Sequence, residues 1–405
     1  MPWEIPVEEI PQNVGEIKIG LYSLADELAK IQKLKGQEMS DAIALYSGRI
    51  VEAMSRQAIE LAKINVEDIT ETATNLDMLY LYGEIDQASL ASAHSLRRFG
   101  NEARHPFNQQ IGMEEEPTIV GLLQFVIEWY ACKFPHGLNE AQENIANIEW
   151  PGNKLLRRLA FGGPDELMFS NEDMNCLLND RCLAGFAGER LIDCKAQLAD
   201  AFTDKAFKKY RNERRLVEMR ALFLSRNGNS RKALAFAKTH LEPRLIRNKK
   251  KISLPEADPF GILGGAYKNY WIDNFQKDKG ISLEEAHKCY SDGSKLCPGN
   301  YYLRVNVAAT ALWLGAVEQA KNQAKKVLEQ FQDHPPHNSL NYWLAATLAE
   351  ANFLAGNHDK AHGLYELAKN LDTTGGRWER TRQQLAVHLN MMGQPELDDH
   401  YNALP

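Results

Sequence analysis

Three short segments of the C-terminal half share one pattern: Gly228-Asn-Ser-Arg-Lys-Ala233, Gly315-Ala-Val-Glu-Gln-Ala320 and Gly356-Asn-His-Asp-Lys-Ala361. A glycine at the first position ends a helix, and the small alanine five residues later lets the next helix approach closely. A looser copy, Gly280-Ile-Ser-Leu-Glu-Glu-Ala286, lies between the first two. The pattern predicts a series of helical hairpins that stack on one another.

The spacing of these alanines sets the repeat length. Ala286 and Ala320 are 34 residues apart, whereas Ala320 and Ala361 are 41 residues apart. Thirty-four residues is the period of a tetratricopeptide repeat, in which each hairpin buries its apolar face against the next. The longer interval predicts an inserted loop around Asp333-His-Pro-Pro-His337. We therefore expect residues 206–405 to form a tetratricopeptide-repeat-like superhelix with a concave surface.

Residues 260–385 also resemble a known family, the tetratricopeptide-type TRAF-binding domain, which is named for stress-activated kinases and occurs in bacterial conflict-system proteins. The blocks that carry the resemblance are Phe260-Gly-Ile-Leu-Gly-Gly-Ala-Tyr-Lys-Asn269, Tyr290, the segment 298–312 and Tyr342-Trp-Leu-Ala-Ala-Thr-Leu-Ala-Glu-Ala351. The resemblance implies a protein-binding or regulatory superhelix. The chain has no Gly-rich loop and no His-Arg-Asp loop, so the sequence does not support a kinase.

Aromatic and amide side chains are candidates for contact with a protein partner on the concave surface. The partner-binding candidates are Tyr302, Asn306, Tyr342 and Trp343, with Tyr301 beside them. Such a groove binds an extended peptide or a helix. The alternative is that at least half of them belong to the hairpin core, because aromatic residues at helical spacing usually pack inside.

The N-terminal part contains a cluster of cationic, amide and imidazole groups, Leu96-Arg-Arg-Phe-Gly-Asn-Glu-Ala-Arg-His-Pro106. On a helix Arg97, Asn101 and His105 share one face, and Arg98 lies within about 60° of that stripe. A permanent cation beside a titratable imidazole can bind a phosphodiester and move a proton. The segment therefore is a candidate catalytic site.

Periodic apolar residues predict the helices around this cluster. The expected helices span residues 14–35, 40–64, 70–104 and 117–132. Gly100 lowers the helix propensity near the end of the third helix, and His105-Pro106 terminates it. Residues 139–205 show mixed polarity and several Pro and Gly residues, which predicts a linker with short helices. No convincing strand alternation occurs.

The cluster resembles the Arg-x-x-Gly-Asn-x-x-x-His signature of a bacterial branch of HEPN-like four-helix domains, over roughly residues 14–135. This resemblance implies a homodimer that cleaves RNA without metal, through attack by the ribose 2′-hydroxyl. His105 matches the catalytic histidine and Asn101 the polar residue beside it. Arg97 fits the Gly-Asn branch, whereas Arg98 gives the more usual Arg-x6-His spacing. The alternative is structural: Asn101 and His105 cap helices, and the arginines pair with acids such as Glu102.

Composition limits the remaining functions. The 405 residues carry a formal net charge of −7, which argues against a nucleic-acid coat protein or a polybasic membrane binder. Any RNA would then contact only a small catalytic surface of the protein. The N-terminal residues lack the features of a signal peptide, and the longest apolar runs are too short to span a bilayer, so we expect a cytoplasmic protein. The six cysteines form no C-x-x-C pair, and we expect no metal and no cofactor.

These observations predict an all-α protein with an N-terminal four- or five-helix HEPN-like bundle (1–138), a helical linker (139–205) and a tetratricopeptide-repeat-like α-superhelix (206–405). The expected function is a metal-independent ribonuclease effector that is regulated by a protein-binding superhelix, by resemblance in antiphage defence or stress response. The alternative is a non-enzymatic adaptor with a degenerate HEPN-like dimerisation bundle.

Overall fold

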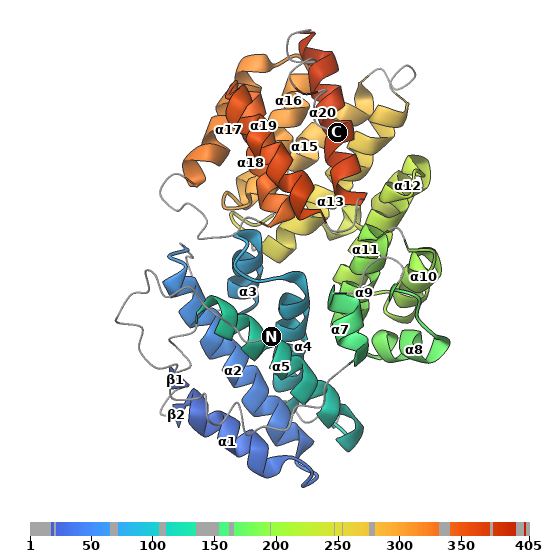
Figure 1. Ribbon diagram of the computed structural model, residues 1–405. Coiled ribbons are helices and arrows are strands. Elements are labelled where there is room, and N and C mark those ends of the chain that lie inside the picture. The colour runs from blue at the N-terminus through green and yellow to red at the C-terminus, as the bar shows by residue number, and fades with distance from the viewer. Residues whose placement is uncertain are drawn as a thin grey trace. The chain divides into compact units, whose positions relative to one another are not determined.

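The computed structural model describes most of the chain (Figure 1). The described residues are 18–19, 22–64, 72–104, 111–134, 154–161, 166–194, 196–246, 248–252, 254–274, 280–331, 341–372, 376–393 and 401. Within them the protein is all-α, as predicted, apart from a two-residue antiparallel ladder between β1 (Lys18–Ile19) and β2 (Tyr22–Ser23). His105 and the loop expected around residues 333–337 lie outside the described residues.

Two compact units divide the chain. Unit 1 comprises Met1–Leu76 and Ser92–Asn153, and unit 2 comprises Asp77–Ala91 and Lys154–Pro405. The helices α3 (Thr72–Leu81) and α4 (Gln87–Arg104) therefore each belong partly to both units. The domain limits predicted at residues 138 and 205 stay predictions.

Unit 1 is a helical bundle. It contains α1 (Leu24–Leu34), α2 (Ser40–Leu61), the 3-10 turn η1 (Met113–Glu115), α5 (Glu116–Lys133), the first part of α3 and most of α4. The helix α5 is buried along almost its whole length, including Leu122, Val126 and Tyr130. This agrees with its sequence, because a helix that is apolar all round belongs in the centre of a bundle.

The single helix predicted over residues 70–104 is wrong, because a turn at 82–86 divides it into α3 and α4. Gly83 has φ +78°, a left-handed conformation that ends α3. Asp86 then starts α4: its Oδ1 accepts hydrogen bonds from the backbone N–H of Ala88 (2.9 Å) and Ser89 (3.0 Å). A left-handed glycine and a carboxylate cap thus divide the segment into two helices, although its apolar residues continue at helical spacing.

Unit 2 begins, beyond the α3–α4 turn, with short helices in the region predicted as a linker. These are α7 (Lys154–Phe161), α8 (Asn171–Asn179), α9 (Arg181–Asp193) and α10 (Ala199–Lys209). Four antiparallel hairpins and a last helix follow: α11 (Arg214–Arg226) with α12 (Ser230–His240), α13 (Leu254–Asp273) with α15 (Ile281–Leu296), α16 (Tyr301–Trp313) with α17 (Val317–Gln330), α18 (Tyr342–Ala355) with α19 (His358–Leu371), and α20 (Gly376–Met392). The 3-10 turn η4 (Glu242–Arg244) follows α12. Each hairpin contacts the next one, which is the arrangement of a tetratricopeptide-like superhelix.

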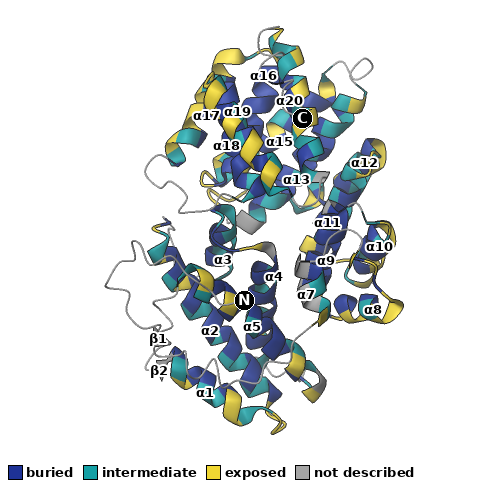
Figure 2. Ribbon diagram, in the orientation of Figure 1, coloured by how far each residue is buried: buried dark blue, intermediate teal, exposed yellow. Residues whose placement is uncertain are grey.

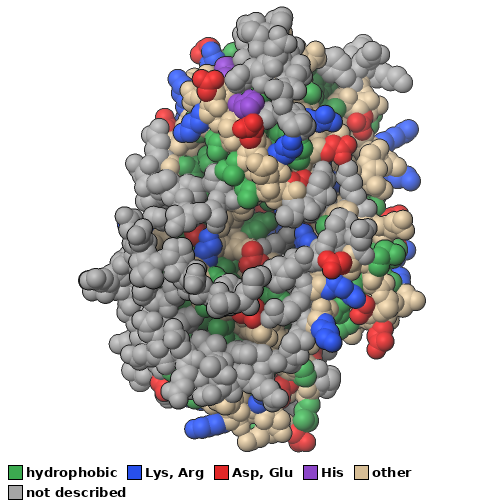
Figure 3. Space-filling view, in the orientation of Figure 1, with side chains coloured by type: hydrophobic (Ala, Val, Ile, Leu, Met, Phe, Trp, Pro, Cys, Tyr) green, Lys and Arg blue, Asp and Glu red, His purple; other side chains and the backbone are tan. Residues whose placement is uncertain are grey.

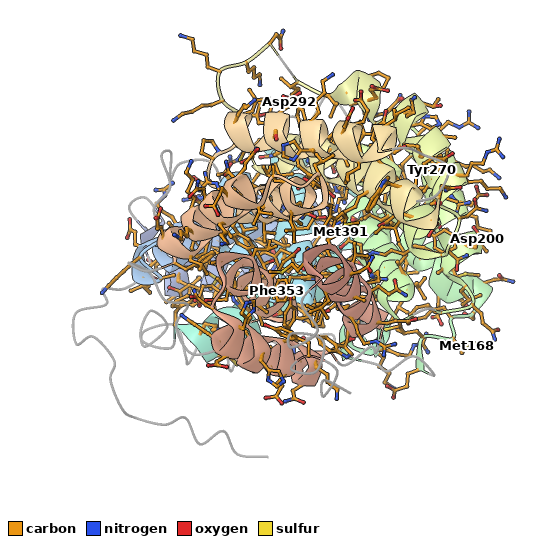
Figure 4. All side chains as sticks on the ribbon, turned by 90° about the horizontal axis from the view of Figure 1, so that it is seen from above. Met168, Asp200, Tyr270, Asp292, Phe353 and Met391 are labelled. Carbon is orange, nitrogen blue, oxygen red and sulfur yellow. The ribbon has the colours of Figure 1, made fainter. Side chains whose placement is uncertain are left out.

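The glycine–alanine pattern has the predicted structural role. Gly315 and Gly356 have φ +82° and +90° at the hairpin turns, where a side chain would strain the backbone. Ala320 and Ala361 are fully buried where the second helix of each hairpin meets the first. The first helices α16 and α18 are buried on nearly every face (Figure 2). Viewed from above, Phe353 of α18 lies in the crowded interior of unit 2, and Asp292 lies at its edge (Figure 4).

Candidate functional site

The helix α4 carries the predicted catalytic cluster of unit 1. Arg98 donates to Glu102 at 2.7 Å, and its guanidinium lies 4.0 Å from the centre of the Phe99 ring. The Arg98 side chain is only 15% exposed. This residue is therefore committed to a contact within its own helix, as the structural alternative expects.

Arg97 is half-buried, as Arg98 is. The Nε atoms of both arginines are buried without a hydrogen bond to any described group. Asn101, one turn further along, is exposed. Because four residues make about one turn, Arg97 and Asn101 share a face of α4, and Arg104 continues it at seven residues. The structure thus places Arg97 and Asn101 on one face.

Sequence reasoning did not identify Arg104 as part of this face. The signal was present, because Arg104 follows Arg97 by seven residues, which is about two turns of a helix. Arg104 approaches Glu52 of α2 at 3.6 Å, and Arg56 donates to the same carboxylate at 3.2 Å. Both arginines are 44% exposed. The end of α4 therefore presents a small cationic surface, with one carboxylate between two guanidinium groups. On the face shown in Figure 3, the described Lys and Arg side chains are interspersed with Asp and Glu.

Gly100, the glycine of the motif, has a packing role that the sequence did not reveal. A Cβ built on Gly100 would lie 3.0 Å from the Cα of Gly48 and 3.3 Å from the carbonyl oxygen of Ala44, both in α2. Both distances are tighter than nine in ten real Cβ contacts, so a side chain here would require α2 and α4 to separate by a few tenths of an ångström. The two glycines thus let α2 and α4 cross with their backbones nearly in contact, close to the stripe that carries Arg97 and Asn101.

The four candidate partner-binding residues of unit 2 divide into two pairs. Asn306 and Tyr342 are each 3% exposed and belong to the core. The Tyr342 hydroxyl shares a hydrogen bond of 2.5 Å with Thr381 Oγ1. Tyr302 is 42% exposed and Trp343 is half-buried, so these two remain accessible. The expectation that half of these side chains are core therefore agrees with their burial.

Trp343 is part of a cationic and aromatic cluster. The guanidinium groups of Arg226 in α11 and Arg377 in α20 each lie 5.6 Å from the centre of its ring. Arg377 also lies 5.9 Å from the ring of Tyr342. Such contacts are worth about 0.5–1 kcal/mol at exposed sites. Three helices that are distant in sequence thus present two arginines around one tryptophan.

A buried polar network lies behind this cluster. Lys268 Nζ donates to Asn306 Oδ1 (2.8 Å) and to Gln384 Oε1 (2.7 Å). Gln384 Nε2 in turn donates to the carboxylate of Glu350. The network joins α13, α16, α18 and α20, and Lys268 is only 8% exposed. Sequence reasoning missed the network, because Lys268, Asn306 and Glu350 stand in three separate blocks of the sequence and no spacing rule relates them to Gln384.

His388 completes the network in one protonation state. The indole Nε1–H of Trp313 can only donate, and it lies 2.9 Å from His388 Nδ1. The proton of the imidazole is therefore on Nε2, which donates to Glu350 at 2.8 Å. The network thus holds one ammonium and one carboxylate, with the neutral imidazole between Trp313 and Glu350.

Burial and pairing have opposite effects on these two charges. Burial lowers the pKa of Lys268 to about 8, although the nearby Glu350 opposes this change. Burial acts to raise the pKa of Glu350, whereas the hydrogen bonds from His388 and Gln384 and the charge of Lys268 act to lower it. The charges of Lys268 and Glu350 thus act on each other at a distance, with Gln384 hydrogen-bonded to both side chains.

Two further classes of site find no support in the described part of the chain. Within the described ranges, His, Cys, Asp and Glu side chains do not gather in groups of three that would hold a metal ion. No described helix combines the length and the apolar character needed to span a bilayer.

Comparison with known proteins supports the tetratricopeptide-like part. Residues 192–312 match the family model of Tetratricopeptide Repeats-Sensor domains. No curated protein matches the chain. The match begins at residue 192, so the HEPN-like interpretation of residues 1–138 stays a prediction.

Two solved structures are similar at low identity. A thermophilic tetratricopeptide protein of Thermus thermophilus shares 18% identity, with a TM-score of 0.37, over 51% of this chain and 99% of its own. The APC/C hetero-tetramer Cut9-Hcn1 shares 14% identity, with a TM-score of 0.29, over 92% of this chain and 86% of that chain. These TM-scores carry no argument about function.

Proposed function

We propose that the superhelix of unit 2 binds a protein partner through Tyr302, Trp343, Arg226 and Arg377. The observation that carries this proposal is Trp343 with two guanidinium groups over its ring. Arginine and tryptophan are the residue types that dominate binding energy in protein interfaces. Two cations beside the half-buried ring of Trp343 fit a partner segment that combines acidic and apolar residues.

The test is the capture of partners by the full chain and by single variants. Trp343→Ala and Tyr302→Ala should each weaken capture at least about tenfold, which is the effect of losing an aromatic anchor. Leu367→Ala is the matched control, because Leu367 is also a large apolar side chain, 38% exposed, but lies on the second helix of its hairpin. If Leu367→Ala weakens capture and Trp343→Ala does not, the partner binds another face.

We also propose that α4 carries a metal-independent ribonuclease site, regulated by the superhelix. Arg97 binds the scissile phosphodiester, Asn101 donates to it, and His105 takes the proton from the attacking ribose 2′-hydroxyl. The 2′-oxygen bonds to phosphorus while the bond from phosphorus to the 5′-oxygen breaks, and the leaving 5′-oxygen takes a proton from water. The products are a 2′,3′-cyclic phosphate and a free 5′-hydroxyl. The shared face of Arg97 and Asn101 supports Arg97, rather than Arg98, as the phosphate ligand.

The ribonuclease proposal is tested with total cellular RNA in the presence of EDTA. Arg97→Ala and His105→Ala should each lower cleavage at least about a hundredfold, a typical loss when a general base or a charge-stabilising group is removed. Arg98→Ala is the matched control and should keep most of the activity. If Arg98→Ala abolishes cleavage and Arg97→Ala does not, the assignment of the two arginines is reversed.

The remaining parts of the proposal follow the resemblance. Two copies would pair through the HEPN-like bundle so that their Arg and His side chains form a composite site, in a cytoplasmic protein of antiphage defence or stress response. The alternative is a non-enzymatic adaptor in which the α4 cluster is structural. Growth on expression separates the two: a ribonuclease slows growth and His105→Ala relieves it, whereas an adaptor does neither.

A further inference from the structure

The turn between α3 and α4 is held by residues of the superhelix. Residues 77–91 belong to unit 2, although residues 1–76 before them and 92–153 directly after them belong to unit 1. The end of α3 leaves its last carbonyl groups without partners inside the helix, as every helix does. Gly83 N–H donates to Tyr80 O (3.0 Å) and Glu84 N–H to Leu79 O (2.8 Å), but Leu81 O needs another donor.

Side chains of α16 and α18 supply the additional donors. The hydroxyl of Tyr301, the first residue of α16, donates to Leu81 O. Asn341 Nδ2 donates to Tyr80 O at 3.3 Å. The same Asn341 caps α18, because its Oδ1 accepts from Leu344 N–H at 2.8 Å. One side chain thus serves the end of α3 and the beginning of α18.

Apolar and amide contacts reinforce this attachment. The ring of Tyr82 lies 5.4 Å from that of Phe331, which in turn lies 5.2 Å from the ring of Tyr301. Gln330 Nε2 donates to Tyr82 Oη (3.2 Å) and to Gly299 O (2.9 Å). All three aromatic rings are buried. The turn is therefore fixed by packing as well as by hydrogen bonds.

The residues that hold the turn are neighbours of the proposed partner-binding residues. Tyr301 precedes Tyr302, and Asn341 stands two residues before Trp343. Both pairs occupy the first turns of α16 and α18. A partner that contacts Tyr302 and Trp343 therefore acts on the same two helix ends that hold the α3–α4 turn.

The helix α4 leads from this turn to the candidate catalytic face. It runs without interruption from Gln87 to Arg104, and residues 87–99 contain no glycine or proline. Arg97 lies about 15 Å along the axis from Gln87, at 1.5 Å per residue. Such a helix moves as a stiff element over this length, so a change at its capped end reaches Arg97 and Asn101.

We infer that the turn at 82–86 is a latch by which the first turns of α16 and α18 control the position and stability of α4. Partner binding at Tyr302 and Trp343 shifts the population of the latched state, and α4 carries the shift to Arg97 and Asn101. The consequence for RNA cleavage rests on the proposed ribonuclease function, whereas the latch itself does not.

Hydrogen–deuterium exchange of the full chain tests the latch without reference to activity. The variants are Tyr301→Phe, which removes one hydroxyl, and Asn341→Asp, which keeps the cap of α18 but loses the donor to Tyr80 O. Because each leaves a carbonyl with one donor fewer, amide exchange in 77–91 should rise about tenfold. Exchange in 92–104 should rise with it, by about threefold or more, because the helix is continuous.

Two matched controls separate the latch from general destabilisation. Asn300→Asp makes the same change at the cap of α16, where Asn300 Oδ1 accepts from Leu303 N–H. Tyr342→Phe removes a hydroxyl that bonds to Thr381 instead. Both controls should leave exchange in 77–104 within twofold of wild type.

The outcomes are distinct. Faster exchange in 77–91 with no change in 92–104 would overturn the coupling, and unchanged exchange in both segments would overturn the latch. Cleavage of total RNA is measured on the same variants: under the proposed function the latch variants change the rate at least about threefold and the controls do not. If the wild type cleaves no RNA, the ribonuclease proposal fails, while the exchange data still decide the latch.

Discussion

Two helix contacts in this protein are built from opposite kinds of groups. In unit 1, α2 and α4 meet at Gly48 and Gly100, where backbone faces backbone and no side chain intervenes. In unit 2, α13 and α20 meet through Lys268 and Gln384, with an ammonium group between amide oxygens. The first contact leaves little room for added side-chain atoms. The second contact depends on charge and on hydrogen bonds.

The difference shows how each contact can fail. A glycine crossing is destabilised when a side chain is added, at any pH, because the two backbones must then separate. A buried polar network is destabilised when one partner is removed, because the remaining buried groups lose hydrogen bonds that water cannot replace. The crossing near Arg97 and Asn101 is therefore sensitive to shape, whereas the superhelix is sensitive to protonation.

The largest effect is expected from Lys268→Met. The substitution keeps much of the side-chain volume but leaves Asn306 Oδ1 and Gln384 Oε1 without their donor and removes a positive charge that acts on Glu350. Each buried group left unsatisfied costs about 1–3 kcal/mol, so the total loss should be about 3–5 kcal/mol. Chemical denaturation at pH 7, followed by hydrogen exchange of unit 2 peptides, measures the loss.

Lys268→Met with Glu350→Gln provides the control for this prediction. The double variant removes both charges and should recover part of the loss, because the buried negative charge that Lys268 balances is also gone. A double variant that is less stable than the sum of both single losses would show that the pair is not the source of the effect.

The pH dependence of the same variant gives a second effect, of about 3 kcal/mol at most. Burial lowers the pKa of Lys268 to about 8, against an ordinary value near 10.5 in the unfolded chain. Between these pH values the unfolded state binds more protons than the folded state, so stability rises with pH. The free-energy difference between wild type and Lys268→Met should therefore widen from pH 8 to pH 10.5.

Buried tyrosines change stability in the opposite direction at high pH, but this comparison removes them. Burial raises the pKa of Tyr290 and Tyr365 well above 10, so the folded state keeps protons that the unfolded state loses. Both proteins contain these tyrosines, and their contribution cancels in the difference. A difference that stays constant between pH 8 and 10.5 would contradict the lowered pKa.

The crossing in unit 1 gives the third effect. Gly100→Ala adds one methyl group 3.0 Å from the Gly48 Cα and should cost about 1–3 kcal/mol, because two backbones must separate. Gly363→Ala is the matched control, since Gly363 lies exposed within α19 with no atom within 4 Å of its Cβ position. It should stabilise the protein by about 0.5–1 kcal/mol, the helix-propensity difference. Equal effects of both substitutions would contradict the crossing.

Sequence reasoning identified the superhelix because its signals are local. Gly315 and Gly356 act within their own turns, and Ala320 and Ala361 are buried five residues later in the same hairpins. The turn at 82–86 has equally local signals, Gly83 followed by the Asp86 cap. The sequence hides them, because apolar residues continue at helical spacing on both sides of the turn.

The interactions that sequence reasoning could not find join distant parts of the chain. Lys268 and Gln384 are 116 residues apart, and Gly48 and Gly100 are 52 apart. No spacing rule relates such positions, because only the folded backbone brings them together. By contrast, the pair Arg98 and Glu102 is four residues apart on one helix, and the sequence already offered it as the structural alternative.

The smallest effect is expected at a hairpin turn, where a glycine is needed for its backbone conformation rather than for space. Gly315 has φ +82° and no atom within 4 Å of a Cβ, so Gly315→Ala should cost about 1 kcal/mol through backbone strain alone. Gly315→Asn should recover about half of this, because asparagine tolerates the left-handed region better than alanine. Thermal unfolding of Gly315→Ala and Gly315→Asn measures which of the two variants is the more stable. If asparagine costs more than alanine, volume rather than conformation limits this position, and the turns of the superhelix would resemble the glycine crossing of unit 1.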